Sequence, residues 1–187
     1  MQKDSKKAQN TQGVQNTQGT RDSTLQDSAL QDSVLSDEER QKLEELCAQS
    51  FDFARADDVE SLKILLDSGL NVNLANEQGN TLIMLAAYNN SLACARLLLE
   101  RGADVDKRND KGQTPLAGVC FKGYYEMAKL LIEHGADVDS EGALSPMNCA
   151  IIFHRAEILK LLRQHSRKKP SFLQKIGFYF LTKFGKK

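Results

Sequence analysis

The sequence reads Gly-Asn-Thr-Leu-Ile at residues 79–83 and Gly-Gln-Thr-Pro-Leu at residues 112–116. It also reads Leu-Leu-Leu-Glu-Arg-Gly-Ala-Asp-Val-Asp at residues 97–106 and Leu-Leu-Ile-Glu-His-Gly-Ala-Asp-Val-Asp at residues 130–139. The members of each pair are 33 residues apart. A fixed period of this length is typical of a solenoid, in which each unit is too small to bury its apolar face without a neighbour.

Each repeat carries the signals of two helices. Thr114 can cap a helix over residues 116–121, and Gly123 can end that helix. Residues 125–133 are apolar around most of a helical circumference and predict a second helix, which ends before Gly135. The segments between helix pairs are polar and rich in turn residues, so we expect each of them to project as a hairpin finger.

These residues resemble ankyrin repeats. Thr114-Pro115-Leu116 stands where that family turns into its first helix, and Gly-Ala-Asp-Val-Asp stands where the second helix runs into the next hairpin. The resemblance implies an all-α ankyrin-repeat solenoid of about four helix-turn-helix units with short β-hairpin fingers, which binds a protein partner. Residues 109–123 look like the third repeat of small bacterial ankyrin proteins. Some of those proteins accompany catalases and are linked to haem supply or peroxide defence, which would give this chain a bacterial stress-response context.

The repeats divide the chain into three parts. Residues 1–35 repeat Asn-Thr-Gln-Gly, lack aromatic residues and read as a disordered, low-complexity segment. Residues 36–163 form the expected repeat domain, and residues 164–187 a basic, aromatic-rich tail. The expected units cover about residues 36–75, 76–108, 109–139 and 140–163.

The outer units depart from the repeat pattern. Ser36 and Glu39 form a capping-box pattern that predicts a long first helix ending near Ala56, with residues 59–66 as its partner helix. This first unit is polar, as the end of a solenoid requires. The fourth unit begins 31 residues after the third, so we expect a blunted last finger.

The family histidine that follows Thr-Pro-Leu is absent from the later units. Met84, Ala117 and Asn148 stand in its place. The hydrogen bonds that this histidine makes between neighbouring hairpins are therefore missing, and we expect less rigid fingers.

The formal net charge of zero hides a strong segregation of charge. Residues 36–162 contain 21 acidic and 13 basic residues, a net charge of −8, whereas residues 163–187 contain eight basic and no acidic residues, a net charge of +8. The chain begins without an apolar signal-peptide region and has no run of 18 apolar residues. Four widely spaced cysteines read as small buried hydrophobes rather than zinc ligands or a disulfide framework. We therefore expect a cytoplasmic protein.

Catalytic motifs are absent from the sequence. His134, His154 and His165 lie at helix ends or in a linker, and none stands at motif spacing from a Cys or Ser nucleophile. There is no phosphate-binding glycine loop, and the carboxylates are scattered. We therefore expect no enzymatic activity, no cofactor and no metal.

The resemblance implies a partner-binding surface at the ends of the first helices and at the finger tips. Tyr88, Phe121 and Ile152 or Phe153 occupy equivalent places in three consecutive units and could form a ladder of apolar anchors; alternatively, Phe121 and Phe153 pack beneath the fingers or against the tail. The other expected partner-binding residues are Arg55, Asn89 and Lys122 along the groove and Glu77, Gln78, Asn80, Asp110, Lys111 and Gln113 on the fingers.

The tail predicts an amphipathic, cationic helix. Phe172, Ile176, Phe180 and Phe184 recur every four residues, with Lys175 and Lys183 among them. Three roles are open for this helix: a cap docked on the acidic repeats, an anchor to an anionic membrane surface, or a binding segment for a protein or nucleic acid. Nucleic acid is the least favoured partner, because phosphate would repel the acidic repeats.

Two functions follow from these readings. The first is a protein-binding adaptor, and the alternative is a membrane-surface recruitment factor that uses its tail to bring a captured client to the bilayer.

Overall fold

The computed structural model describes residues 35–169 and 172–184, so the predicted disordered segment, apart from Leu35, lies outside the described residues. The described residues form nine helices, which alternate with turns. They are α1 (Asp37–Ala56), α2 (Val59–Asp67), α3 (Leu82–Tyr88), α4 (Leu92–Glu100), α5 (Pro115–Lys122), α6 (Tyr125–Glu133), α7 (Pro146–Ile152), α8 (Ala156–His165) and α9 (Phe172–Phe184).

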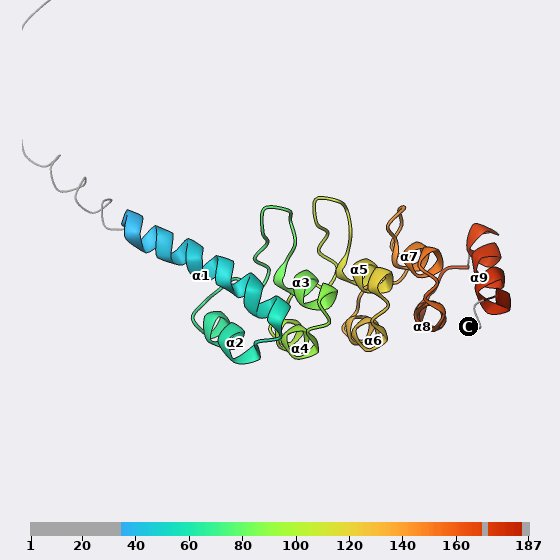
Figure 1. Ribbon diagram of the computed structural model, residues 1–187, viewed down its shortest axis with the longest axis horizontal. Helices are drawn as coiled ribbons and strands as arrows, with labels where there is room; N and C mark the ends of the chain where they lie inside the picture. The colour runs from blue at the N-terminus through green and yellow to red at the C-terminus, as the bar shows by residue number, and fades with distance from the viewer. Residues whose placement is uncertain (1–34, 170–171, 185–187) are drawn as a thin grey trace, which may run out of the picture. The chain divides into compact units, whose positions relative to one another are not determined.

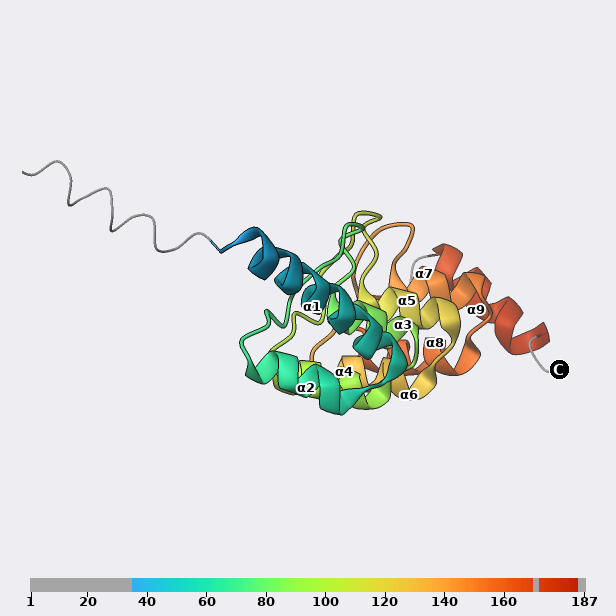
Figure 2. The ribbon, with the colours of Figure 1, turned by 60° about the vertical axis from the view of Figure 1, so that its left-hand side comes forward.

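The helices of the repeat region stack in two rows. α3, α5 and α7 lie side by side in one row, and α4, α6 and α8 form a second row beneath them (Figure 1). The loops before α3, α5 and α7 rise on one side of the stack, as a second view also shows (Figure 2). One continuous apolar core runs between the rows, and Leu98, Leu116 and Leu131 are among its fully buried members. An all-α repeat solenoid is therefore the observed architecture.

Each first helix from α3 onward begins with the same hydroxyl cap. Thr81, Thr114 and Ser145 are buried, and each side-chain oxygen accepts a hydrogen bond from the backbone N–H three residues later. This bond satisfies one of the N–H groups that the first turn of a helix leaves without a partner. The predicted ends of α5 and α6 are confirmed, because Gly123 and Gly135 both have a φ of +91°.

The fingers are built around turns. Within the described ranges the only strand-like pairing outside the helices is one antiparallel bridge between Ala75 and Thr81, so the expected β-hairpin fingers are not confirmed. Asn76 and Asn109 instead hold the first two fingers, since the side-chain oxygen of each accepts bonds from two backbone N–H groups of its own finger. The connection between Gly135 and Ser145 is two residues shorter than the equivalent one between Gly102 and Thr114.

A row of hydrogen bonds ties successive repeats together at the base of the fingers. The acceptors are side chains 33 residues apart, and each receives a backbone N–H from the next segment of the stack. The pairs are Asp104 N with Asn73 Oδ1 at 2.8 Å, Asp137 N with Asp106 Oδ2 at 3.0 Å, and Arg167 N with Asp139 Oδ2 at 2.9 Å. The linker after α8 thus takes the place that a further repeat would occupy.

The tail helix packs on the end of the stack, but not through the predicted stripe. α9 contacts α7 and α8 (Figure 1), as a cap would. Phe172, Ile176 and Phe180 nevertheless remain exposed, so the contact with the repeats does not bury this part of the stripe. The side chain of Phe184, the fourth member of the stripe, lies outside the described part of the structure.

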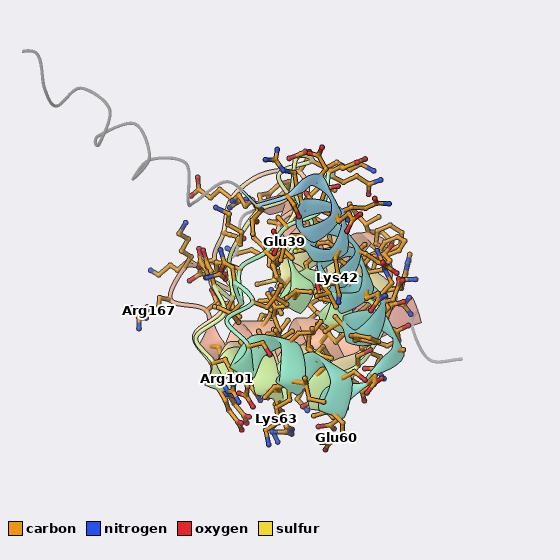
Figure 3. All side chains as sticks on the ribbon, turned by 90° about the vertical axis from the view of Figure 1, so that its left-hand side faces the viewer. Glu39, Lys42, Glu60, Lys63, Arg101 and Arg167 are labelled. Carbon is orange, nitrogen blue, oxygen red and sulfur yellow. The ribbon has the colours of Figure 1, made fainter. Side chains whose placement is uncertain are left out.

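The edge of the stack opposite the fingers is polar. Glu60, Lys63 and Arg101 lie along this edge when the molecule is viewed from its α1 end (Figure 3). Arg101 forms an ion pair with Asp67 at 2.7 Å, which joins α2 to the end of α4. None of the helices in the described part of the chain is both long and apolar enough to cross a membrane.

Candidate functional site

Three aromatic rings form a connected ladder across successive helix pairs. Tyr88 at the end of α3 stacks on Phe121 of α5, with ring centroids 6.3 Å apart and an interplanar angle of 8°. Phe121 meets Phe153 edge to face, with centroids 4.4 Å apart. Tyr88 and Phe121 are half-buried, whereas Phe153 is 40% exposed and the neighbouring Ile152 is 59% exposed. The rings support one another while part of their surface stays open to a ligand.

Two basic side chains contact residues of the ladder. The ammonium of Lys122 lies 4.4 Å from the centroid of the Tyr88 ring, within the range of a cation–π contact. Arg155 donates hydrogen bonds from Nε and Nη2 to the carbonyl oxygen of Phe121, at 3.3 and 3.1 Å. This contact holds the last turn of α5 against the loop before α8, and it fixes the backbone that carries the central ring.

A groove of about 530 Å³ adjoins the ladder between the first two fingers and α3. Its apolar lining comes from Met84, Leu85 and Tyr88, and its walls are amides and charged groups. The groove brings together nine of the residues that the sequence predicted for partner binding. They are Arg55, Glu77, Gln78, Asn80, Tyr88, Asn89, Asp110, Lys111 and Gln113.

The two fingers beside this groove are joined to each other. Asn109 Nδ2 donates to Asn80 Oδ1 at 2.9 Å, and the backbone N–H of Asp110 donates to the carbonyl of Gln78 at 3.2 Å. Between these first two fingers, the expected loss of hydrogen bonding is therefore compensated by Asn109. Because the bonds are made within the protein, the finger wall of the groove is already formed without a partner.

The chemistry of the three buried cysteines argues against a nucleophile among them. Burial raises the pKa of the Cys94 thiol to about 12, and the negative charge of Asp57 adds to the shift. Burial likewise raises the pKa of Cys120 and of Cys149. These thiols stay protonated near neutral pH, and a protonated thiol is neither a good nucleophile nor a metal ligand. Within the described residues, no three His, Cys, Asp or Glu side chains are grouped so that they could hold a metal ion.

Two family models match this repeat region. One, described as ankyrin repeats (many copies), matches residues 65–119, and the other, ankyrin repeats (3 copies), matches residues 102–171. Together the matches run from residue 65 to residue 171, which is more than half of the 187 residues. The chain is an ankyrin repeat protein. No curated protein matches it significantly.

The other predicted residues of the ankyrin surface extend past the groove. Phe121, Lys122, Ile152 and Phe153 do not line it, but Phe121 continues from Tyr88 along the ladder. Met84 and Leu85 were not identified from the sequence as groove residues. Asn109 was also not identified from the sequence as the residue that hydrogen-bonds the two ankyrin fingers to each other. The equivalence of Asn76 and Asn109 across the 33-residue period could have indicated their shared role in shaping the fingers.

Proposed function

We propose that this ankyrin repeat protein is a non-enzymatic interaction module that binds a protein partner along the aromatic ladder and the adjoining finger groove. The observation that carries the proposal is the ladder of Tyr88, Phe121 and Phe153, which joins three successive helix pairs and keeps exposed aromatic surface. At many protein interfaces a few residues contribute most of the binding energy, and aromatic residues such as Tyr and Trp are enriched among them. A ladder that is already assembled loses little side-chain entropy when a partner binds.

The proposed binding surface combines the ladder with polar residues that fix orientation. Arg55 and Asn89 lie at one end of the groove, and Lys122 lies over Tyr88. Glu77, Asp110 and Lys111 provide charges of both signs on the finger side. We assign the surface to four ankyrin units with the boundaries expected from the sequence, each supplying one helix pair from α1 to α8. Nucleic acid is not the proposed partner, because residues 36–162 carry a net charge of −8.

The test compares capture of partners by the full chain and by single alanine variants. Tyr88→Ala, Phe121→Ala and Phe153→Ala should each reduce the amount of specific partner recovered from native lysate at least about tenfold, as expected for a binding hot spot. Tyr125→Ala is the matched control, because Tyr125 is also an exposed aromatic residue but lies on α6 outside the ladder. Retention of the same partners by all three ladder variants at wild-type levels would refute the proposal.

A second candidate function is recruitment to a membrane surface. The observation that favours it is the exposed aromatic and basic face of α9, at the opposite end of the repeat stack from α1 (Figure 1). A protein with both surfaces would capture a client on its repeats and hold it near the bilayer. Flotation of the full chain with lipid vesicles tests this function, and a chain that stays unbound with every vesicle composition contradicts it.

A further inference from the structure

The two sides of α9 have different surroundings. On the inner side, Gly177 lies against Ile151 of α7, so closely that an added Cβ at Gly177 would be 2.5 Å from Cγ2 of Ile151. Only a residue without a side chain permits this approach. The inner side of α9 is therefore packed against the end of the repeat stack, and a ligand can bind α9 only on its other side.

The outer side of α9 is apolar and basic at once. Its exposed apolar members are Phe172, Ile176, Tyr179 and Phe180, whose exposed fractions are 75%, 39%, 54% and 56%. Lys175 and Lys183 are exposed among them. At 100° per residue these six positions fall within an arc of about 140°, and Gly177 lies about 130° from the centre of that arc. One face of the helix thus carries all six side chains.

Lysine and aromatic groups are in direct contact on this face. Lys183 Nζ lies 2.8 Å from the hydroxyl of Tyr179 and 5.2 Å from the centroid of its ring. A lysine beside an aromatic ring can lay its methylene stem along an apolar surface while its ammonium reaches polar headgroups. Lysine is depleted from protein–protein interfaces, whereas a face that combines lysine with aromatic residues is typical of helices that lie in a bilayer interface.

The charge around α9 favours an anionic surface. Residues 163–187 contain eight basic residues and no acidic residue. In the linker before α9, Lys168 forms an ion pair with Glu141 of the last finger at 2.7 Å, so this lysine already has an acidic partner within the protein. With 13 residues, α9 is about 20 Å long, too short to cross a bilayer about 30 Å thick. The helix is suited to lie on a membrane and not to span it.

We propose that α9 binds the surface of an anionic phospholipid membrane through its outer face while its Gly177 side stays packed on α7. The inference rests on the second candidate function and defines its ligand and its geometry. One helix then closes the repeat stack and attaches it to the membrane, so that binding requires no release of the tail. The sequence alone had presented capping and membrane binding as alternatives; the two faces of α9 make them compatible.

The first experiment measures binding of the full chain to phosphatidylserine-containing vesicles and to pure phosphatidylcholine vesicles. The wild-type chain should bind only the former, and Lys175→Glu/Lys183→Glu should lower binding at least about tenfold, since each lysine near such a surface contributes about fivefold. Lys63→Glu/Lys107→Glu makes the same change in net charge at exposed sites on the repeats and should alter binding less than about twofold. All variants should keep the wild-type thermal midpoint.

The second experiment tests whether α9 stays docked. A Cβ built on Gly177 lies 3.7 Å from Cβ of Ile151, close to the mean Cβ separation in disulfides. Ile151→Cys/Gly177→Cys should therefore oxidise to a disulfide that locks α9 on α7, and the locked chain should bind anionic vesicles as well as the reduced chain does. Locked protein that binds only after reduction would overturn the docked geometry but leave membrane recruitment standing.

Other outcomes count against the proposal more broadly. A wild-type chain that binds neither vesicle type overturns both the inference and the second candidate function, and leaves the outer face of α9 to a protein partner. Equal binding to both vesicle types overturns the requirement for anionic lipid. Failure of the cysteine pair to oxidise would show that the inner side of α9 does not rest on α7 in solution.

Discussion

At the scale of single residues, Gly123 is required both by its left-handed backbone conformation and by the close approach of Arg155. Its φ is +91°, and an added Cβ would be 2.7 Å from Nε of Arg155, which bonds the carbonyl of Phe121. We predict that Gly123→Ala destabilises the protein by more than the backbone cost alone, which is about 1–2 kcal/mol in the left-handed region. The excess arises because the new methyl group displaces Arg155 from a charged hydrogen bond worth about 1.5–3 kcal/mol. Urea unfolding measures the change in the free energy of unfolding.

The control for this substitution is provided by the repeat itself. Gly135 has the same φ of +91°, but an added Cβ there would meet nothing within 4 Å. Gly135→Ala should therefore show only the backbone cost, and the difference between the two variants should vanish when Arg155 is also changed to Ala. Equal losses at both glycines in the presence of Arg155 would contradict the argument.

The helix-ending role of Gly123 was accessible from the sequence, whereas its contact with Arg155 was not. A glycine after an apolar run is a local signal and needs no knowledge of neighbours. Arg155 is 32 residues away, and its position over Gly123 depends on how two units stack. Residue pairs of this kind become visible only when the repeat is folded against its neighbour.

At the scale of helices, stability depends on burial between units. Leu98 of α4 and Leu131 of α6 are equivalent residues and are fully buried. We predict that Leu98→Ala or Leu131→Ala lowers the free energy of unfolding by about 2–5 kcal/mol, because each leaves a cavity in the core. Ile64→Ala on α2 should change it by less than about 0.5 kcal/mol, since Ile64 is exposed. Losses of similar size at all three positions, measured by chemical denaturation, would contradict the assigned register.

Sequence patterns located the helices well and described the connections less well. The bounds of α6 were predicted in full, because an apolar run followed by glycine defines both ends. The expected β-hairpin pairing of the fingers is not confirmed beyond one bridge, and the side chains of Asn76 and Asn109 accept hydrogen bonds from backbone N–H groups of their own fingers. For α9 the sequence indicated one apolar stripe, whereas the close approach of Gly177 to Ile151 shows that a different side of the helix lies against α7.

At the scale of the whole molecule, the row of Asn73, Asp106 and Asp139 links each segment of the stack to the next. The acceptors are equivalent in sequence, but their surroundings differ along the stack. Burial, with the nearby charges of Asp137 and Asp104, raises the pKa of Asp106. Partial burial opposes ionisation of Asp139, but hydrogen bonds from Ser166 and from the backbone of Arg167 outweigh it and lower its pKa.

These opposite shifts predict opposite responses to acid. A carboxyl group whose folded pKa is lowered stabilises the fold above its unfolded pKa, and this contribution is lost as the pH falls through the folded value. Acid should therefore weaken the hydrogen bonds that Asp139 accepts from Ser166 and Arg167 of the linker to α9. For Asp106 the folded pKa is raised, which means that folding disfavours its ionised form. Protonation of Asp106 in acid should therefore remove a cost to folding rather than weaken the fold.

The carboxyl-carbon chemical shifts of the two aspartates, followed by NMR during a pH titration, test this prediction directly. The midpoint for Asp139 should fall below the ordinary aspartate value of 3.8, and that for Asp106 should lie above it. Ser166→Ala removes the donor 2.5 Å from Asp139; it should move the Asp139 midpoint up towards 3.8 and leave the Asp106 midpoint unchanged. If Ser166→Ala does not move the Asp139 midpoint, the linker does not occupy the place of a further repeat in solution.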